Sequence, residues 1–333
     1  NKRGGWTEFS GQSCGLSSLC TLALVNSGVA KDDPDMVRAM RYLREFQPSE
    51  TYSVSLQTLV FCQVGAAGDL PRIRRNVDWL IAHQIPGDPI GQRGGAWNYG
   101  IAGGGDPSNT QFALLALGAA QDRGIEIKVD VFRRALAYWR PRQRDTGGWS
   151  YRDSGQPSGS MTCAGIASVI ITRGCIGVAD AEGQGDQIQC CGSEQAGPDP
   201  IENGLDWLAK HFTLQVNPGG KSGDSMTLFY YLYALERVGR LSGRRFIGDH
   251  DWYREGSERL LSLQDDFEGF WAGSGIMEEN RQVATSFALL FLSKGKRQVV
   301  VGRVKYGNPG TAAGWNRHPD GLRQLVRHVE RDW

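Results

Sequence analysis

Two kinds of helical segment alternate along this chain, and the alternation constrains the fold more than any other feature of the sequence. The first kind is amphipathic and closes with an apolar or aromatic pair, three variable residues and usually a glutamine. Its five copies end with residues 41–47, 78–84, 137–143, 206–212 and 258–264. Apolar residues recur in them at helical intervals, as at Met36, Met40 and Leu43, with charged residues between. These segments predict helices with one solvent-exposed face.

The second kind of segment is apolar on nearly all sides. Each copy begins with hydroxyl or amide side chains that suit a helix N-cap, and most copies end at a glycine. The six starts lie at residues 13–15, 53–55, 108–110, 160–162, 225–227 and 285–286. A helix without a polar face must be buried all round. Six buried helices alternating with five or six amphipathic ones predict an all-α fold, an (α/α)6 toroid with an inner and an outer ring.

Loops between the repeats share a pattern of glutamine, glycine and tryptophan. Residues 143–149 read Gln-Arg-Asp-Thr-Gly-Gly-Trp, and residues 264–271 repeat the pattern with one extra residue. Glycines also precede Trp6 and Trp97. A glutamine at one helix end can bond to the backbone at the start of the next helix, while tryptophan covers the apolar base of the loop. We therefore interpret Trp6, Trp97, Trp149 and Trp271 as structural residues.

These loops resemble the QW repeats of the terpenoid cyclase and protein prenyltransferase superfamily. More narrowly, the chain resembles the squalene-cyclase-like toroids of the bacterial prenyltransferase/squalene-oxidase repeat proteins. The resemblance implies a central cavity for an isoprenoid or another long apolar ligand, walled by aromatic side chains that stabilise a carbocation by cation–π contact. We assign the toroid to residues 1–296. Residues 297–333 are expected to form an extended segment and a closing helix, or a connector to a further domain.

Candidate site residues follow from the expected geometry of the ring. The inner-helix N-termini should converge at one mouth, where their partial positive charge favours anions and carboxylates. Asp106, Asp224 and Glu278 precede three of these helices and are our candidate catalytic acids, with helix capping as the alternative for the two aspartates. Side chains just inside the mouth are candidate ligand-binding residues. They are Tyr52, Asn109, Phe112, Thr162, Thr227, Tyr230, Tyr231 and Phe287.

The known chemistries of the resembling families need motifs that this sequence lacks. Squalene-hopene-type cyclases protonate an alkene with the central aspartate of a DxDD motif, in a desolvated setting that tunes the acid. Here Asp32-Asp33-Pro34-Asp35 has the wrong order and precedes an outer helix, and no metal-binding DDxxD motif occurs. Prenyltransferases bind zinc through Asp, Cys and His, but Met226 stands where the cysteine is expected. We expect neither a metal nor a cofactor.

Charge and hydropathy limit the classes of partner. The 37 Lys and Arg residues balance 36 Asp and Glu residues, so a nucleic-acid partner is not expected. No uninterrupted apolar stretch has the length of a membrane-spanning helix, whereas peripheral membrane contact stays open. Because the chain begins at Asn1 without a leader, we expect an excised domain or processed fragment with further domains in the parent chain. The cysteines leave the compartment open.

Three functions are compatible with these sequence features. The first is a terpenoid-cyclase-like protein that binds an isoprenoid or other long apolar ligand, with cyclase activity disfavoured by the missing DxDD motif. The second is a noncatalytic binding or scaffolding toroid within a larger protein, which predicts an interior filled by side chains. The third is an (α/α)6 carbohydrate-active enzyme, which needs paired carboxylates across a groove lined by exposed aromatic residues, for which Asp224, Glu278 and Glu279 are the candidates.

Overall fold

A computed structural model describes residues 4–87, 94–99, 104–179, 182–184, 187–189, 199–219, 227–275 and 277–293 of the 333-residue chain. Two of our expectations lie outside the described residues. One is the candidate acid Asp224, and the other is the segment 297–333 with its closing helix.

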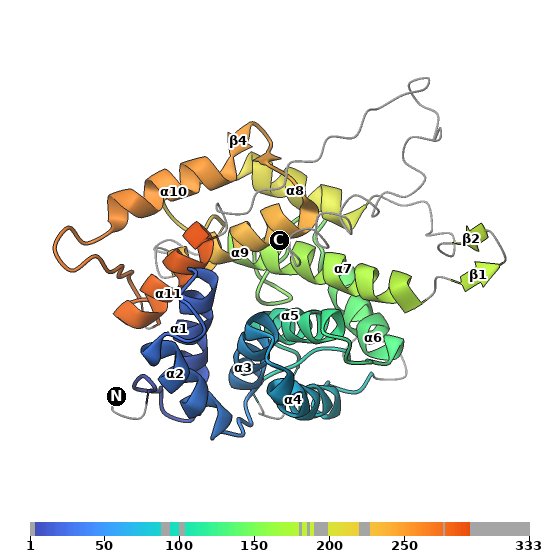
Figure 1. Ribbon diagram of the computed structural model, residues 1–333. Helices are drawn as coiled ribbons and strands as arrows, with labels where there is room; N and C mark the ends of the chain where they lie inside the picture. Colours follow the sequence, from blue (N-terminus) through green and yellow to red (C-terminus); the bar gives the residue numbers. More distant parts are fainter. Residues whose placement is uncertain are drawn as a thin grey trace.

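The described residues form an all-α toroid built from eleven α-helices (Figure 1). Six of them make the inner ring: α1 (Gly15–Asn26), α3 (Thr51–Val64), α5 (Pro107–Asp122), α7 (Gly159–Ala179), α9 (Leu228–Ser242) and α11 (Arg281–Leu292). Each inner helix contacts the next one along the chain, and α11 returns to contact α1. The inner ring is therefore closed, as the alternation of segments predicted.

Five described helices form the outer layer: α2 (Pro34–Arg44), α4 (Leu70–Ala82), α6 (Val129–Trp139), α8 (Pro200–Lys210) and α10 (Trp252–Leu263). They pack against α1, α3, α7, α7 and α9, respectively. Short elements lie in the connections: the 3-10 turns η1 (Ala67–Asp69) and η2 (Arg140–Arg142), the antiparallel pair β1 (Glu182–Gln184) and β2 (Gln187–Gln189), and the pair β3 (Phe246–Ile247) and β4 (His250–Asp251).

Burial explains the two kinds of helix. Twelve of the sixteen residues of α5 are buried, so no side of that helix faces water, whereas α2 buries only Met36, Ala39, Met40, Tyr42 and Leu43. Within α7, the stretch Gly159–Gly177 has the length and mean hydropathy, 1.3, of a helix that crosses a membrane. Because 78% of that window is buried inside the fold, it also has the character of a core helix.

The glutamine and tryptophan side chains tie successive outer helices together. Gln143 Nε2 donates to the carbonyl of Pro200 at the start of α8, at 2.8 Å, and Trp149 Nε1 donates to the carbonyl of Trp139 at the end of α6, at 3.0 Å. One repeat earlier, Gln84 Nε2 reaches Val131 in α6 at 2.9 Å, and Trp97 Nε1 reaches Leu80 in α4 at 2.7 Å. These side chains bond to the backbone of the loops and outer helices.

Candidate functional site

The first turns of the inner helices lie at one mouth of the ring. A Cβ on Gly15 of α1 would lie 3.0 Å from Ser53 Oγ of α3. Asn217 joins α7 to α9: its Oδ1 accepts from Ser160 N at 2.9 Å and its Nδ2 donates to Thr227 Oγ1 at 3.0 Å. Thr227, which we expected to bind ligand, therefore takes part in a contact between two helix N-termini.

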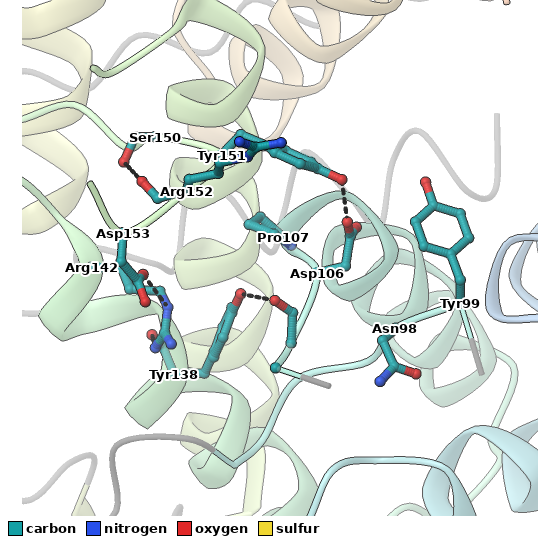
Figure 2. A pocket seen from close by; sticks show the side chains of 12 residues that line it. Asn98, Tyr99, Asp106, Pro107, Tyr138, Arg142, Ser150, Tyr151, Arg152 and Asp153 are labelled. Atoms are coloured by element: carbon teal, nitrogen blue, oxygen red, sulfur yellow. Dashed lines mark hydrogen bonds and ion pairs between the residues drawn. The ribbon is translucent and has the colours of Figure 1, made fainter. Parts of the chain in front are cut away.

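A pocket of about 420 Å³ opens at this mouth, between the loops that lead into α5 and α7 (Figure 2). The end of α6 and the turn that follows it supply Tyr138 and Arg142. Its lining consists of Asn98, Tyr99, Gly104, Gly105, Asp106, Pro107, Tyr138, Arg142, Ser150, Tyr151, Arg152 and Asp153. Charged and hydroxyl-bearing side chains dominate this lining, so the pocket suits a polar ligand.

Asp106 lies in this pocket and caps α5. Its Oδ1 accepts from Ser108 Oγ at 2.5 Å, from Asn109 N at 2.8 Å and from Asn109 Nδ2 at 3.1 Å. Its Oδ2 accepts a hydrogen bond from the Tyr151 hydroxyl (Figure 2). Both oxygens are thus engaged, and Asp106 is held rigidly between the start of α5 and the loop before α7.

Two tyrosines flank Asp106 with half-exposed rings. Tyr99 is 46% exposed and Tyr151 is 48% exposed. The pKa of Tyr151 is raised by partial burial and by its hydrogen bond to Asp106, and that of Tyr99 is raised by burial and by the charge of Asp106. Both hydroxyls therefore stay protonated near neutral pH and serve as hydrogen-bond donors.

A stacked arginine forms the opposite wall. The guanidinium carbon of Arg142 lies 3.9 Å from the ring centroid of Tyr138, and Arg142 Nη1 donates to the Tyr138 carbonyl at 3.0 Å. Its Nε lies 3.4 Å from Asp153 Oδ1 (Figure 2). The Tyr138 hydroxyl donates to the carbonyl of Gly105 at 3.3 Å. Arg142 is thus oriented by a buried aromatic ring and by one exposed carboxylate.

Arg144 fixes the loop that carries Tyr151, Arg152 and Asp153. Its Nη2 donates to Ser150 Oγ at 3.0 Å, to the Arg152 carbonyl at 3.2 Å and to the Asp153 carbonyl. Arg144 Nε also donates to Ser150 Oγ at 3.3 Å and Nη2 lies 3.4 Å from the Gly155 carbonyl, so two nitrogens of one planar guanidinium reach four acceptors of a single loop. We assign Arg144 the role of positioning the pocket wall.

Aromatic side chains occupy the ring interior. The ring centroids of Tyr52 and Phe112 are 4.9 Å apart, those of Tyr230 and Phe287 are 5.9 Å apart, and those of Tyr233 and Phe287 are 5.3 Å apart. Phe112 also stacks with Tyr230 and Tyr233, so contacts link all five rings. The structure thus brings together four of our candidate ligand-binding residues, Tyr52, Phe112, Tyr230 and Phe287. These rings contact one another.

Glu278 precedes α11 in the chain, but its carboxylate lies at the start of α9. Its carboxylate accepts from the backbone N–H groups of Phe229 at 3.1 Å and Tyr230 at 2.8 Å, in the first turn of α9. Burial raises the pKa of Glu278 to about 7, although these backbone N–H groups oppose the shift. Glu8, in the same manner, accepts from Leu16 N in α1 at 2.8 Å. Among the described residues, no hydrogen bond or ion pair joins Glu278 to Asp106.

The remaining candidates make contacts within the scaffold. Thr162 Oγ1 accepts from Trp149 N at 3.1 Å, and a Cβ on Gly159 would lie 2.6 Å from the Tyr231 ring, so this ring packs on α7. Asn109 bonds to Asp106 through Nδ2, while its buried Oδ1 has no hydrogen-bond partner among the residues that the structure describes. In the part of the chain that the structure describes, no group of three His, Cys, Asp or Glu side chains has the geometry for a metal ion.

Our expectations from the sequence did not include Tyr99, Tyr151 or Arg142. A signal for the two tyrosines was present, because each stands two residues after the tryptophan of its loop, in Trp97-Asn98-Tyr99 and Trp149-Ser150-Tyr151. The corresponding position after Trp6 is Glu8, which caps α1. The second residue after the loop tryptophan therefore directs its side chain toward the mouth in three repeats. Arg142 had no comparable signal, since arginines are frequent throughout the outer helices.

Comparison with known proteins supports the fold. No protein-family model matches the sequence, and no curated protein matches it. Among solved structures, the apo form of the type II terpene cyclase MstE from Scytonema is similar, with a TM-score of 0.52 and 13% sequence identity. The similarity covers 89% of this chain and 94% of that chain. At 13% identity the similarity shows a terpene-cyclase-like toroid fold and carries no information about a reaction or a ligand of this chain.

Proposed function

We propose that this toroid is a noncatalytic binding module and that its ligand occupies the pocket at the mouth of the ring. The observation that carries the proposal is a pocket at the mouth whose lining is rich in charged and hydroxyl-bearing side chains. Aromatic rings from α3, α5, α9 and α11 contact one another in the described interior, and a space of about 420 Å³ lies at the mouth, lined by Tyr99, Asp106, Arg142 and Tyr151 among others. A ligand that uses this space needs hydrogen-bonding groups to match the lining.

The hydrogen bonds of Asp106 also favour binding over acid catalysis. An acid that protonates an alkene must present a protonated oxygen to the apolar interior. The Oδ1 atom of Asp106 instead accepts three hydrogen bonds from the start of α5, and Oδ2 accepts from Tyr151 at the outer mouth. The geometry is that of a helix cap whose outer oxygen borders the pocket.

An isoprenoid ligand is the second candidate. It is supported by the structural similarity to a type II terpene cyclase and by the five aromatic rings of the interior. Such a ligand would lie beside or between these rings, among which Tyr233 has its centroid 6.3 Å from that of Phe112 and 5.3 Å from that of Phe287. The carbohydrate-active enzyme is less well supported, because Glu278, one of its three candidate carboxylates, caps α9, and Asp224 lies outside the described residues.

Mass spectrometry of an organic extract, after incubation with squalene and polyprenyl diphosphates, tests the proposal directly. We expect neither a cyclised product nor a retained lipid. A new product that disappears in Asp106→Asn would overturn the proposal and establish a cyclase. Retained but unchanged lipid, with the same amount bound by Tyr151→Phe, would place the ligand in the ring interior and favour the second candidate.

A further inference from the structure

The two exposed tyrosine rings provide flat apolar faces at the entrance of a polar pocket. Tyr99 and Tyr151 come from successive repeats and lie on either side of Asp106 (Figure 2). Both residues remain about half exposed, although the Tyr151 hydroxyl donates to Asp106 and the ring centroid of Tyr99 lies 5.8 Å from that of Tyr52. Half-exposed aromatic faces beside hydrogen-bonding groups are suited to a ring that is apolar on its faces and polar at its edge. Sugar rings have this distribution of groups.

The same pocket carries two guanidinium groups. Arg142 is oriented by its stack on Tyr138, and its Nη2 has no hydrogen bond or ion pair to another described residue. Arg152 also lines the pocket, and its side chain makes no hydrogen bond or ion pair within the described part of the chain. Arginine side chains bind carboxylates through paired N–H donors, so unsatisfied donors in a pocket favour an anionic ligand.

Asp153 is a partner that a ligand can replace. Its carboxylate lies 3.4 Å from Arg142 Nε and its side chain is 83% exposed. An ion pair that is long and solvent-exposed contributes little to stability. A ligand carboxylate that approaches Arg142 from the pocket would form shorter, paired hydrogen bonds with the guanidinium. The displaced Asp153 carboxylate would then be hydrated by solvent.

From these three features we infer that the pocket at the mouth binds an acidic saccharide of the uronic acid type. The sugar ring would pack against Tyr99 or Tyr151, its hydroxyl groups would bond to the outer oxygen of Asp106, and its carboxylate would bond to Arg142 and Arg152. This inference rests on the proposed function, because it requires the pocket to be the binding site. It goes beyond that function by naming the chemical class of the ligand.

Isothermal titration of the full chain with a tri-glucuronate tests the inference, with a neutral glucose trisaccharide of the same linkage and sodium acetate as matched controls. We expect the uronate to bind at least tenfold more tightly than the neutral sugar, and acetate to bind no more strongly than the neutral sugar. Arg142→Gln should lower the uronate affinity at least tenfold. The matched change Arg41→Gln, on the outer helix α2, should leave the affinity unchanged.

Asp153→Asn separates ligand binding from a structural role of the arginine. Removing the competing carboxylate should raise the uronate affinity several-fold, whereas a purely structural Arg142–Asp153 pair would lead to unchanged or weaker binding. Equal affinity for the uronate and the neutral sugar would overturn the inference but keep the pocket as a binding site. Tighter binding of a sulfated neutral sugar than of the uronate would have the same two consequences. Absence of binding to every saccharide also overturns it. Lipid retained in the ring interior would instead refute the proposed function.

Discussion

The backbone N–H of Trp149 donates a hydrogen bond to the hydroxyl of Thr162, 3.1 Å away, and so ties a loop to the first turn of the inner helix that follows. The same relationship joins Trp97 to Thr110 at 3.0 Å and Trp271 to Thr285 at 3.0 Å. At the start of the chain, the N–H of Trp6 bonds to Ser17 Oγ at 2.9 Å. Four of the six inner helices, α1, α5, α7 and α11, thus use one hydroxyl to satisfy one tryptophan N–H of the preceding loop.

Thr162→Val should lower the free energy of unfolding by about 1–3 kcal/mol, because it leaves the buried N–H of Trp149 without an acceptor. Thr162→Ser keeps the hydroxyl and is the matched control, with a smaller loss from the missing methyl group. Urea unfolding of the three proteins measures the difference. If the valine variant is as stable as the serine variant, this hydrogen bond does not stabilise the fold.

Gly147→Ala should be far more destabilising than Gly124→Ala. Both glycines have positive φ angles, 93° and 80°, so both substitutions carry the cost of a left-handed alanine, about 1 kcal/mol. A Cβ on Gly147 would also lie 2.3 Å from the backbone oxygen of Asn203 in α8, whereas a Cβ on Gly124 would meet nothing within 4 Å. Thermal unfolding should show a clearly larger fall in Tm for Gly147→Ala, and equal falls would contradict the close approach.

Arg144→Lys should loosen the pocket wall with little effect on the rest of the fold. Lysine keeps the charge but lacks the rigid pair of donors, Nε and Nη2, that holds the guanidinium against Ser150 Oγ while Nη2 also meets the carbonyls of Arg152 and Asp153. We expect the Tyr151 signals to shift in NMR spectra and the loop 150–155 to exchange amide hydrogens faster. The signals of Trp271 serve as an internal reference in a distant repeat. Unchanged exchange in the loop would show that Arg144 is not needed to position it.

Glu278 should make stability decrease as the pH rises from about 4.5 to about 7. The folded protein holds the Glu278 proton more tightly than the unfolded chain, because burial raises the pKa from 4.5 to about 7. Folding is therefore favoured below this range and loses about 3 kcal/mol across it. Unfolding free energies measured between pH 4 and pH 8 should show this decline in the wild type and a flatter profile in Glu278→Gln. Parallel profiles would assign the pH dependence to other groups.

Helix pairs were predictable from the sequence because burial dictates their composition. The apolar run of α5 and the spaced apolar residues of α2 each follow from the side of the helix that meets water. The candidate site was harder to predict, since adjacent helical residues point about 100° apart. Tyr230 and Tyr231 looked equivalent in the sequence, but Tyr230 joins the aromatic rings of the interior and Tyr231 packs on Gly159.

The sequence by itself determined the alternation of buried and amphipathic helices and the capping of α5 by Asp106, because both depend on local periodicity or on a few neighbouring positions. The carboxylates of Glu8 and Glu278 instead reach the first turns of α1 and α9 from other segments, and the contact of α11 with α1 that closes the ring is long-range, so both depend on packing. Only the tertiary structure decided that aromatic rings from α3, α5, α9 and α11 meet in the interior. It also decided that Arg142 and Tyr151 share a pocket with Asp106. These groups belong to different repeats, and their distances depend on how the helices pack around the ring.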